Sequence, residues 1–351
     1  MILLLSFDVR RRGGIERLTL QVQNSLESTG HKVQLLTPKR LGPGALGRQL
    51  GRLWFLLQLL PALWRSKQVL SMHVLMLKPL HWLKWCRRQD QDLLCWVHGI
   101  EVWGRNRTTQ SLALSRCRKL LASSRFTRNQ LACIPCPISV VHPMADLIDP
   151  ATPPAPLPGT LTLLTVARMS RAESYKGHGL IVEALDALNR RGELPNGLLW
   201  EVVGEGDERP ELMQRVADLG LEPWVQFHGS LSDKALKAAF ARSSIFLMPS
   251  FFSINERGEA SGEGFGIVYL EAALAGRASI ACEVGGQSDL IRHGETGWLI
   301  PPESSALVQV LRELIHTPSH AKQRGLQARA HALENFSAQR FNKQLQEALR
   351  I

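Results

Sequence analysis

The chain has 351 residues, more than the roughly 250 to 300 at which a single hydrophobic core stops growing, so two domains are expected. A composition of 44% hydrophobic and 21% charged residues, with a mean hydropathy of -0.07, is typical of globular proteins. It excludes disordered, collagen-like and polytopic membrane chains.

The formal net charge of +11 is concentrated in the first half of the chain. Residues 1–150 contain 22 basic and 8 acidic residues, a local charge of +14, whereas the other 201 residues contain 20 basic and 23 acidic residues, a local charge of -3. A basic half suggests an anionic partner such as nucleic acid, a phosphate-bearing substrate or an anionic membrane face.

In chain order, residues 1–8 predict a buried strand, and no secretory leader is expected because no cleavage site of small residues follows. Residues 15–29 predict a helix with apolar residues three and four positions apart, and Gly30 is its C-terminal stop. With residues 31–37 as the next strand, the chain opens with a Rossmann-like βαβ unit. Further strands of this half are predicted at residues 68–76, 92–97, 119–122 and 138–141.

Five prolines among residues 150–158 predict a stiff linker that neither a sheet nor a helix would accept. The sequence therefore predicts a domain over 1–149, a linker over 150–159, a second domain over 160–335 and a closing helix over 336–351 that could pack back on the first domain. Apolar runs of the second domain alternate with helical segments and predict a parallel, doubly wound sheet. These runs are residues 161–166, 198–203, 224–228, 245–249, 279–282 and 298–300.

The six cysteines are too sparse for a disulfide framework, so a reducing compartment is expected and the protein is predicted to be cytoplasmic. Cys133 and Cys136 form a C-x-x-C pair without a second pair at zinc-ribbon spacing, so they are interpreted as structural thiols. The longest nearly apolar run, residues 53–64, is shorter than the roughly 18 to 20 residues that span a bilayer.

Residues 48–67 combine apolar and tryptophan positions with the basic residues Arg48, Arg52, Arg65 and Lys67. Such a helix could lie on the inner face of an anionic membrane, which would make the protein peripheral. It could equally pack on the sheet of the first domain with its charged ends exposed. The sequence leaves both readings open.

Ligands of open parallel sheets bind beyond the carboxyl ends of the strands, so the loops there are candidate sites. Residues 168–179 follow the first strand of the second domain, and Arg168 and Lys176 with nearby glycines suit a phosphate or diphosphate at a helix N-terminus. The alternative is a solvated charged loop.

The densest signal is residues 262–271, in which alternate glycines precede an apolar helix and expose its N–H groups to an anion. Glu263 and Glu271 are eight positions apart, about 12 Å at a helical rise of 1.5 Å per residue. At that spacing one carboxylate can accept hydrogen bonds from the hydroxyls of a sugar and the other from those of a ribose. Alternatively, Glu271 is an ordinary charged residue of the helix.

Two features of the first half point to the same kind of site. Gly13 and Gly14 follow the first strand and permit a close backbone approach to a phosphate, or form an ordinary tight turn. His98 ends another predicted strand, and a histidine there is either structural or directed at a ligand.

Together these motifs resemble family 4 (group 1) of the retaining glycosyltransferases, which have the GT-B fold of two facing Rossmann-like domains with a donor cleft between them. The resemblance covers nearly the whole chain and is strongest in the second half. It rests on residues 13–16, 98–101, 168–177, 263–271, 285–286 and 294–298.

The resemblance implies transfer of a hexose from a nucleotide-sugar donor with retention of anomeric configuration and without a metal or other cofactor. It implies that Arg168 and Lys176 hold the diphosphate, Glu263 the sugar hydroxyls and Glu271 the ribose, with His98 near the sugar. The backbone of Gly13, Gly14, Gly264, Phe265 and Gly266 would complete the donor site. Arg168, Lys176, Glu263 and His98 would be the catalytic group.

Some residues depart from the family pattern or bear on the donor. Ala167 replaces a usual Gly, residues 277–279 lack a frequent Pro, and Asp289 replaces a frequent Glu, which puts the sugar contacts in doubt. Residues 173–178 and the polar insertion at 253–262 resemble bacterial users of GDP-mannose more than users of UDP-sugars. The expected acceptor is a lipid-linked or polysaccharide glycan of the cell envelope.

Three other functions remain to be weighed. An inactive nucleotide-sugar-binding protein would keep the same residues, whereas a nucleic-acid-binding protein is disfavoured because no helix-turn-helix, zinc or RNA-binding signature is present. A dinucleotide-dependent dehydrogenase is disfavoured because no G-x-G-x-x-G follows the first strand, where Arg10, Arg11 and Arg12 stand instead.

Overall fold

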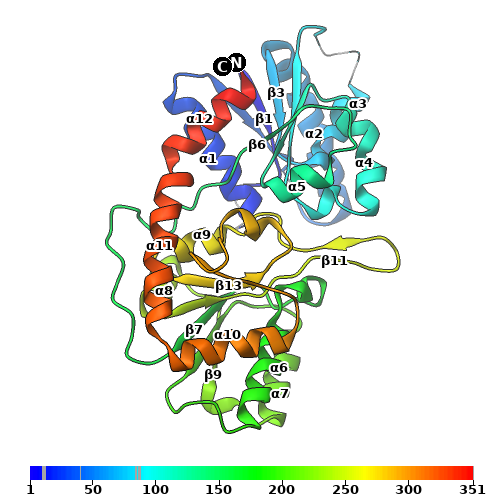
Figure 1. Cartoon of the computed structure of the whole chain (residues 1–351). Helices are drawn as coiled ribbons and strands as arrows, with labels where there is room; N and C mark the ends of the chain where they lie inside the picture. Colours follow the sequence, from blue (N-terminus) through cyan, green and yellow to red (C-terminus); the bar gives the residue numbers. More distant parts are fainter. Residues whose placement is uncertain (10–12, 40, 84, 86–87, 351) are drawn as a thin grey trace. The chain divides into compact units, whose positions relative to one another are not determined.

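A computed structural model of the chain describes residues 1–9, 13–39, 41–83, 85 and 88–350 (Figure 1). Arg10, Arg11 and Arg12, and the side chain of Arg48, lie outside this description. The chain divides into two compact units: the first comprises Met1–Met144, Glu256–Glu259 and the chain from Ala338 onward, and the second comprises Ala145–Asn255 and Ala260–Ser337.

The first unit is built on a six-stranded parallel sheet in the order β2-β1-β3-β4-β5-β6. A strand is present at each of the six predicted places, but the one predicted over residues 68–76 ends at Ser71, and Val74–Met76 form a 3-10 helix instead. The strands are β1 (Ile2–Leu5), β2 (Val33–Leu36), β3 (Gln68–Ser71), β4 (Asp92–Val97), β5 (Lys119–Ala122) and β6 (Ile138–Val140). The helices are α1 (Gly14–Ser28), α2 (Gly44–Arg65), α3 (Leu77–Trp82), α4 (Arg105–Ser115), α5 (Arg125–Gln130) and α12 (Ala338–Leu349).

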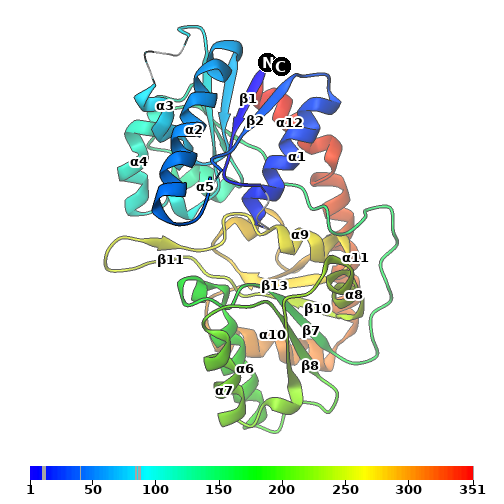
Figure 2. The same ribbon diagram turned by 180° about the vertical axis from the view of Figure 1, so that it is seen from behind.

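The core of the first unit joins the two ends of the chain. Helix α12 lies beside α1, as both views show (Figures 1 and 2). Phe341 and Leu345 of α12 are buried among Leu18 of α1 and Leu4 and Trp96 of the sheet. The last helix is therefore a structural part of the first unit, although the whole second unit separates it from that unit in sequence.

The second unit is built on another six-stranded parallel sheet, in the order β14-β13-β10-β7-β8-β9. The six predicted strands are again confirmed. They are β7 (Thr162–Val166), β8 (Leu199–Val203), β9 (Val225–Gly229), β10 (Ile245–Leu247), β13 (Ala278–Cys282) and β14 (Gly297–Ile300). The helices are α6 (His178–Asn189), α7 (Arg209–Asp218), α8 (Asp233–Arg242), α9 (Ile267–Leu274), α10 (Ser304–His316) and α11 (Ser319–Asn335).

Both faces of this second sheet are buried. Neighbouring residues of a strand point to opposite faces, so Leu163 packs in one hydrophobic core and Leu164 in the other. Burial on both faces explains why these strands read as continuous apolar runs. The polar insertion after β10 forms an antiparallel hairpin of β11 (Ser253–Ile254) and β12 (Ala260–Ser261), which the sequence did not predict.

The proline-rich linker is packed on the second unit, and the division into units falls before it, after Met144. The buried guanidinium of Arg277 donates to the carbonyl of Ala155 in the linker (2.9 Å) and to two carbonyls at the C-terminal end of α8. Arg329 of α11 similarly binds the carbonyls of Pro150 and Thr152 (2.7 Å each). Burial lowers the pKa of Arg277 to about 10, so it remains charged at neutral pH.

Candidate functional site

The strand order locates the ligand edge of each sheet. In the second unit the order reverses between β7 and β10, because the chain builds outward from β7 to β8 and β9 and then crosses to β10. In the first unit the order reverses between β1 and β3. Ligands of such sheets bind where the loops after the two central strands separate. In the second unit those loops carry Arg168 to Lys176 and Glu263.

Lys176 and Glu263 form an ion pair between these two loops, although 87 residues separate them. Each side chain is only 14% exposed. Burial by itself would lower the pKa of Lys176, but the neighbouring acidic groups, with Glu263 foremost, together outweigh this effect and the pKa is raised above its ordinary value. The ammonium therefore stays charged, and it lies 5.2 Å from the centre of the Tyr175 ring.

The backbone around Lys176 is fixed by its packing on the segment after β10. Phe251 N donates to the carbonyl of Tyr175 (2.9 Å). Gly177 has a φ of +84°, and a Cβ there would lie 2.5 Å from the carbonyl oxygen of Pro249. Only glycine satisfies both conditions, so Gly177 lets the Lys176 loop lie directly against its neighbour.

The glycine-rich loop before α9 contacts the loop after β13. Gly286 N donates to the carbonyl of Glu263 (2.8 Å), and a Cβ on Gly286 would lie 2.1 Å from the carbonyl oxygen of Gly264. Gly266, with a φ of +85°, turns the chain into α9. The loop thus has a fixed shape and ends at a helix N-terminus, which favours an anion.

Other predicted residues of this unit are placed differently from Lys176 and Glu263. The Phe265 side chain is buried against Phe336, with the ring centres 6.0 Å apart, so only its backbone is available to a ligand. Glu271 is buried in α9. Arg168 is 76% exposed and forms an ion pair with Glu173.

The structure corrects the helical spacing between the two predicted acids. Helix α9 begins at Ile267, so Glu263 and the glycines after it form a loop. The rise of 1.5 Å per residue applies only to the helical part of the segment. The estimate of about 12 Å between Glu263 and Glu271 is therefore not supported.

In the first unit Gly13 and Gly14 stand at the start of α1, after the central strand β1. Gly13 precedes the helix in extended conformation, and its carbonyl accepts the Arg17 amide (3.1 Å). The Glu16 carboxylate lies beside Gly13, where a Cβ would be 2.2 Å from one of its oxygens. This helix N-terminus lies at the ligand edge of its sheet.

His98 is held in one orientation by hydrogen bonds within the first unit. Its Nε2 donates to the carbonyl of Met72 (2.7 Å), which follows β3. Its Nδ1 is hydrogen-bonded to the Ser123 hydroxyl (3.1 Å), which itself accepts from Trp96 Nε1 (2.9 Å). The Glu101 carboxylate accepts the His98 amide (2.5 Å). The ring is thus fixed at the carboxyl end of β4.

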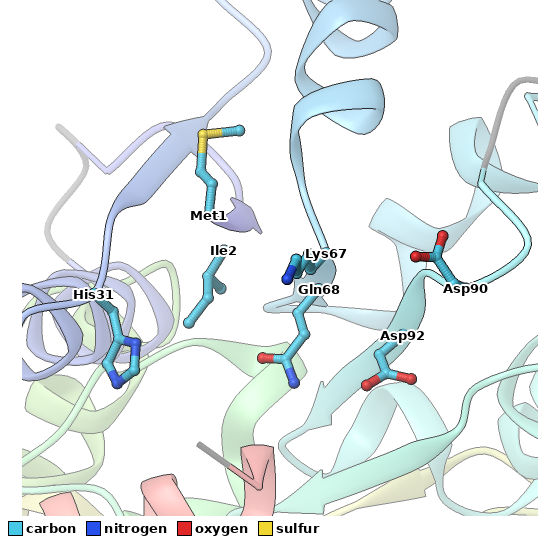
Figure 3. Close-up of a pocket in the computed structure, with 7 residues that line it drawn as sticks. All are labelled: Met1, Ile2, His31, Lys67, Gln68, Asp90 and Asp92. Atoms are coloured by element: carbon cyan, nitrogen blue, oxygen red, sulfur yellow. The ribbon is translucent and has the colours of Figure 1, made fainter.

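A different hollow lies at the amino-terminal edge of the first sheet, with a volume of about 370 Å³ (Figure 3). Its acidic side chains already have partners: Asp90 pairs with Arg88 (2.9 Å) and Asp92 with Arg118. The hydrogen bond from Arg118 is the largest cause of the lowered pKa of Asp92. Because this edge is opposite the carboxyl ends of the strands, we do not assign the site to it.

Sequence reasoning missed the residues that support the charged pair. Tyr175 has no distinguishing signal within the predicted loop of residues 168–179, yet burial raises its pKa to about 12, so it is a neutral neighbour of Lys176. The contact of Gly286 with Gly264 and the carbonyl of Met72 on His98 were also missed. A hydrogen bond to a backbone carbonyl cannot be predicted from the residue types, whereas the Gly285-Gly286 pair indicates a close backbone contact.

Residues 160–331, just under half of the chain, match the model of a protein family described as Glycosyl transferases group 1. The amylovoran biosynthesis glycosyltransferase AmsK of Erwinia amylovora is 28% identical over 66% of this chain and 55% of its own length. A GDP-mannose-dependent alpha-(1-6)-phosphatidylinositol monomannoside mannosyltransferase of Mycolicibacterium smegmatis is 31% identical over 52% of this chain and 47% of its own length. The chain spans about half the length of the curated relatives it matches.

Similar solved structures cover almost the whole chain. Anabaena HepE in complex with UDP and glucose has a TM-score of 0.75 at 20% identity, with 99% of each chain covered. Sucrose-phosphate synthase from Thermosynechococcus elongatus has a TM-score of 0.77 at 18% identity, with 99% of this chain and 98% of that chain covered. The predicted fold class is thereby confirmed: α/β, with two domains of parallel sheets, as in GT-B glycosyltransferases.

Proposed function

We propose that the protein is a retaining glycosyltransferase that moves a hexose, preferably mannose, from a nucleotide-diphosphate sugar to a glycan acceptor. The observation that carries this proposal is the Lys176–Glu263 pair, a largely buried cation and acid at the point where the strand order of the second sheet reverses. The family match over residues 160–331 supports it, since that range contains both residues.

Each part of the pair has a chemical task in such a transfer. The Lys176 ammonium, which keeps its charge, neutralises the diphosphate that accumulates negative charge as it leaves. The Glu263 carboxylate accepts hydrogen bonds from the sugar hydroxyls, and the free N–H groups at the start of α9 bind phosphate oxygens. Arg168, which is largely exposed, adds a second cation from the same loop as Lys176.

The remaining roles extend this arrangement. Glu271 holds the ribose, His98 contacts the sugar, and Gly13 and Gly14 offer their backbone to the diphosphate from the first unit. Lys176 and Arg168 supply the positive charge that a metal ion supplies in other transferases, so we propose that the reaction needs no metal. The acceptor is a lipid-linked or polysaccharide glycan of the cell envelope.

GDP-mannose is the preferred donor in this proposal. The mycobacterial relative described as GDP-mannose-dependent is 31% identical, whereas the HepE structure that contains UDP is 20% identical. Donor choice is tested by thermal stabilisation of the protein with UDP, GDP, ADP and their sugars. A ligand at a hundred times its Kd adds about 2.7 kcal/mol to the free energy of unfolding. Stabilisation by UDP-sugars alone would mean that the donor is a UDP-sugar and not GDP-mannose. If no nucleotide stabilised the protein, the proposed donor site would be refuted.

Site variants test the assignment directly. We expect Lys176→Ala and Glu271→Ala each to weaken donor binding or turnover at least tenfold, about 1.4 kcal/mol, because each removes one anchor of the donor. Cys133→Ser, at an exposed thiol, is the matched control and should leave both unchanged. Calorimetry with the preferred nucleotide gives binding, and sugar release gives turnover. Donor binding at the wild-type level in both site variants would contradict the assignment.

The reaction type has its own tests. The anomeric configuration of the product, measured by nuclear magnetic resonance, should equal that of the donor, and inversion would reject the retaining mechanism. A chelator should leave the rate unchanged. Binding of the nucleotide sugar without transfer or hydrolysis would instead favour the inactive binding protein.

A further inference from the structure

The outer face of helix α2 carries a continuous apolar stripe. Residues along it alternate three and four positions apart, which places them on one side of a helix, and the stripe is about 27 Å long at 1.5 Å per residue. We define the α2 stripe as Leu46, Leu50, Leu53, Leu57, Leu60 and Trp64. Five of these side chains are 46% to 69% exposed, and Leu60 is half-buried.

The opposite face of the same helix is occupied by the fold. Phe55, Leu59 and Leu63 are 5% exposed or less, and α2 contacts β2 of the first sheet. The helix is therefore apolar on two sides, and its own unit covers only one of them. Exposed apolar surfaces of this length are uncommon and mark interaction sites.

All charged residues in and around α2 are basic. Residues 28–89 contain no aspartate or glutamate. The basic residues of this segment are Lys32, Lys39, Arg40, Arg48, Arg52, Arg65, Lys67, Lys78, Lys84, Arg87 and Arg88. Arg52 and Arg65 are exposed on α2 itself. A partner of this surface must therefore accept leucine and tryptophan side chains and also offer negative charge.

We propose that the α2 stripe docks on an anionic lipid bilayer. Leucines enter the boundary between headgroups and acyl chains, tryptophans favour that interface, and the surrounding lysines and arginines face anionic headgroups. Because Phe55 and Leu59 remain packed in the first unit, the helix offers only its outer face, and the domain lies on the surface.

A second copy of this chain fits the stripe less well. The spacing of the stripe would suit a helix–helix seam. Pairing α2 with another α2 would, however, bring together two segments whose charged residues are all basic, with no acidic residue of the segment to offset the repulsion. An anionic surface neutralises the same charges.

The experiment uses the full chain without nucleotide, so its outcome is independent of the proposed function. We expect the protein to co-sediment with vesicles of phosphatidylglycerol and phosphatidylcholine but not with phosphatidylcholine alone. Each basic residue at the surface contributes about fivefold to the affinity. Raising the salt from about 0.1 M to about 1 M shortens the screening length from ~10 Å to ~3 Å and should release the protein.

A charged substitution on the stripe tests the geometry. The pair Leu53→Glu and Leu57→Glu should reduce vesicle binding at least tenfold, because both exposed side chains would carry charge into the interface. Leu112→Glu is the matched control, because Leu112 is 65% exposed on α4 of the same unit, and it should bind as the wild type does. If the glutamate pair lowers the melting temperature, the milder pair Leu53→Gln and Leu57→Gln replaces it.

Two results would overturn the proposal. One is vesicle binding that is absent in the wild type or unchanged in the stripe variants. The other is a dimer, detected by light scattering, that the stripe variants dissociate while vesicles fail to bind the wild type. The second result would assign the stripe to self-association.

Discussion

At the scale of single residues, burial determines the charge states around the candidate site. The Glu263 carboxylate contributes to the raised pKa of Lys176, and Tyr175 stays neutral because burial raises its pKa. His178, two positions after Lys176, is buried, and neither ring nitrogen has a hydrogen-bond partner among the residues that the structure describes. Its pKa is lowered to about 4, first by burial and then by the Lys176 charge.

His178 should make the second unit sensitive to acid. His178 takes up a proton near its ordinary pKa of 6.5 in the unfolded chain but only near 4 in the folded chain. The free energy of unfolding is therefore at its full value above pH 6.5 and decreases as the pH falls toward 4. The loss is about 2 kcal/mol at pH 5 and about 3 kcal/mol in full. His178→Phe, which removes no hydrogen bond, should lose less of its melting temperature between pH 7.5 and pH 5 than the wild type does.

Wild type measured in parallel is the control for His178→Phe, since His73 of the first unit, whose pKa is also lowered to about 4, is present in both proteins. The informative quantity is the difference between wild type and variant at each pH. An equal fall in melting temperature for both proteins would contradict the role of His178.

At the scale of elements, the loops of the second unit are shaped by glycines that accept close contacts. Gly177 and Gly286 each lie against a backbone carbonyl of another loop. These contacts join segments that follow different strands, so the order of the strands determines which loops meet. The Lys176 loop and the loop before α9 meet because β7 and β10 are neighbours.

Gly177→Ala should displace the Lys176 loop. The new Cβ would lie 2.5 Å from the Pro249 carbonyl, and the positive φ adds strain of about 1 to 2 kcal/mol. We expect at least tenfold weaker nucleotide binding, measured by calorimetry. Gly192→Ala is the matched control, since its φ is also positive, at +67°, but a Cβ there meets nothing within 4 Å. The control should lose a similar amount of stability through backbone strain and keep its affinity for the nucleotide. Equal nucleotide affinities of the two variants would contradict the role of Gly177 in placing the Lys176 loop.

At the scale of the whole molecule, chain order and domain membership differ. Helix α12 follows the second unit in sequence but is packed in the core of the first. The linker residues, which the sequence placed between domains, are held on the second unit by Arg277 and Arg329. The part of the chain that the structure describes has no helix long and apolar enough to cross a membrane.

Leu345→Ala in α12 should destabilise the first unit selectively. Leu345 is fully buried, and removing a buried leucine side chain costs about 2 to 5 kcal/mol. In calorimetric unfolding we expect one transition to move to lower temperature and a second, from the other unit, to stay in place. Glu347→Ala, at an exposed position of the same helix, should move neither. A shift of the second transition alone would contradict the assignment of α12.

The sequence by itself determined the elements and the chemistry of single loops. The twelve strands of the two parallel sheets were predictable, because most of them are largely apolar runs bounded by turns, although strands such as β6 and β9 are only partly buried. Lys176 and Glu263 were predictable as candidates, because charged and glycine-rich loops after such strands are local patterns. Only the tertiary structure decided that these two side chains meet, that Phe265 points into a core and that His98 is fixed by a carbonyl of another loop. These contacts depend on which strands become neighbours, and packing between residues distant in sequence determines that order.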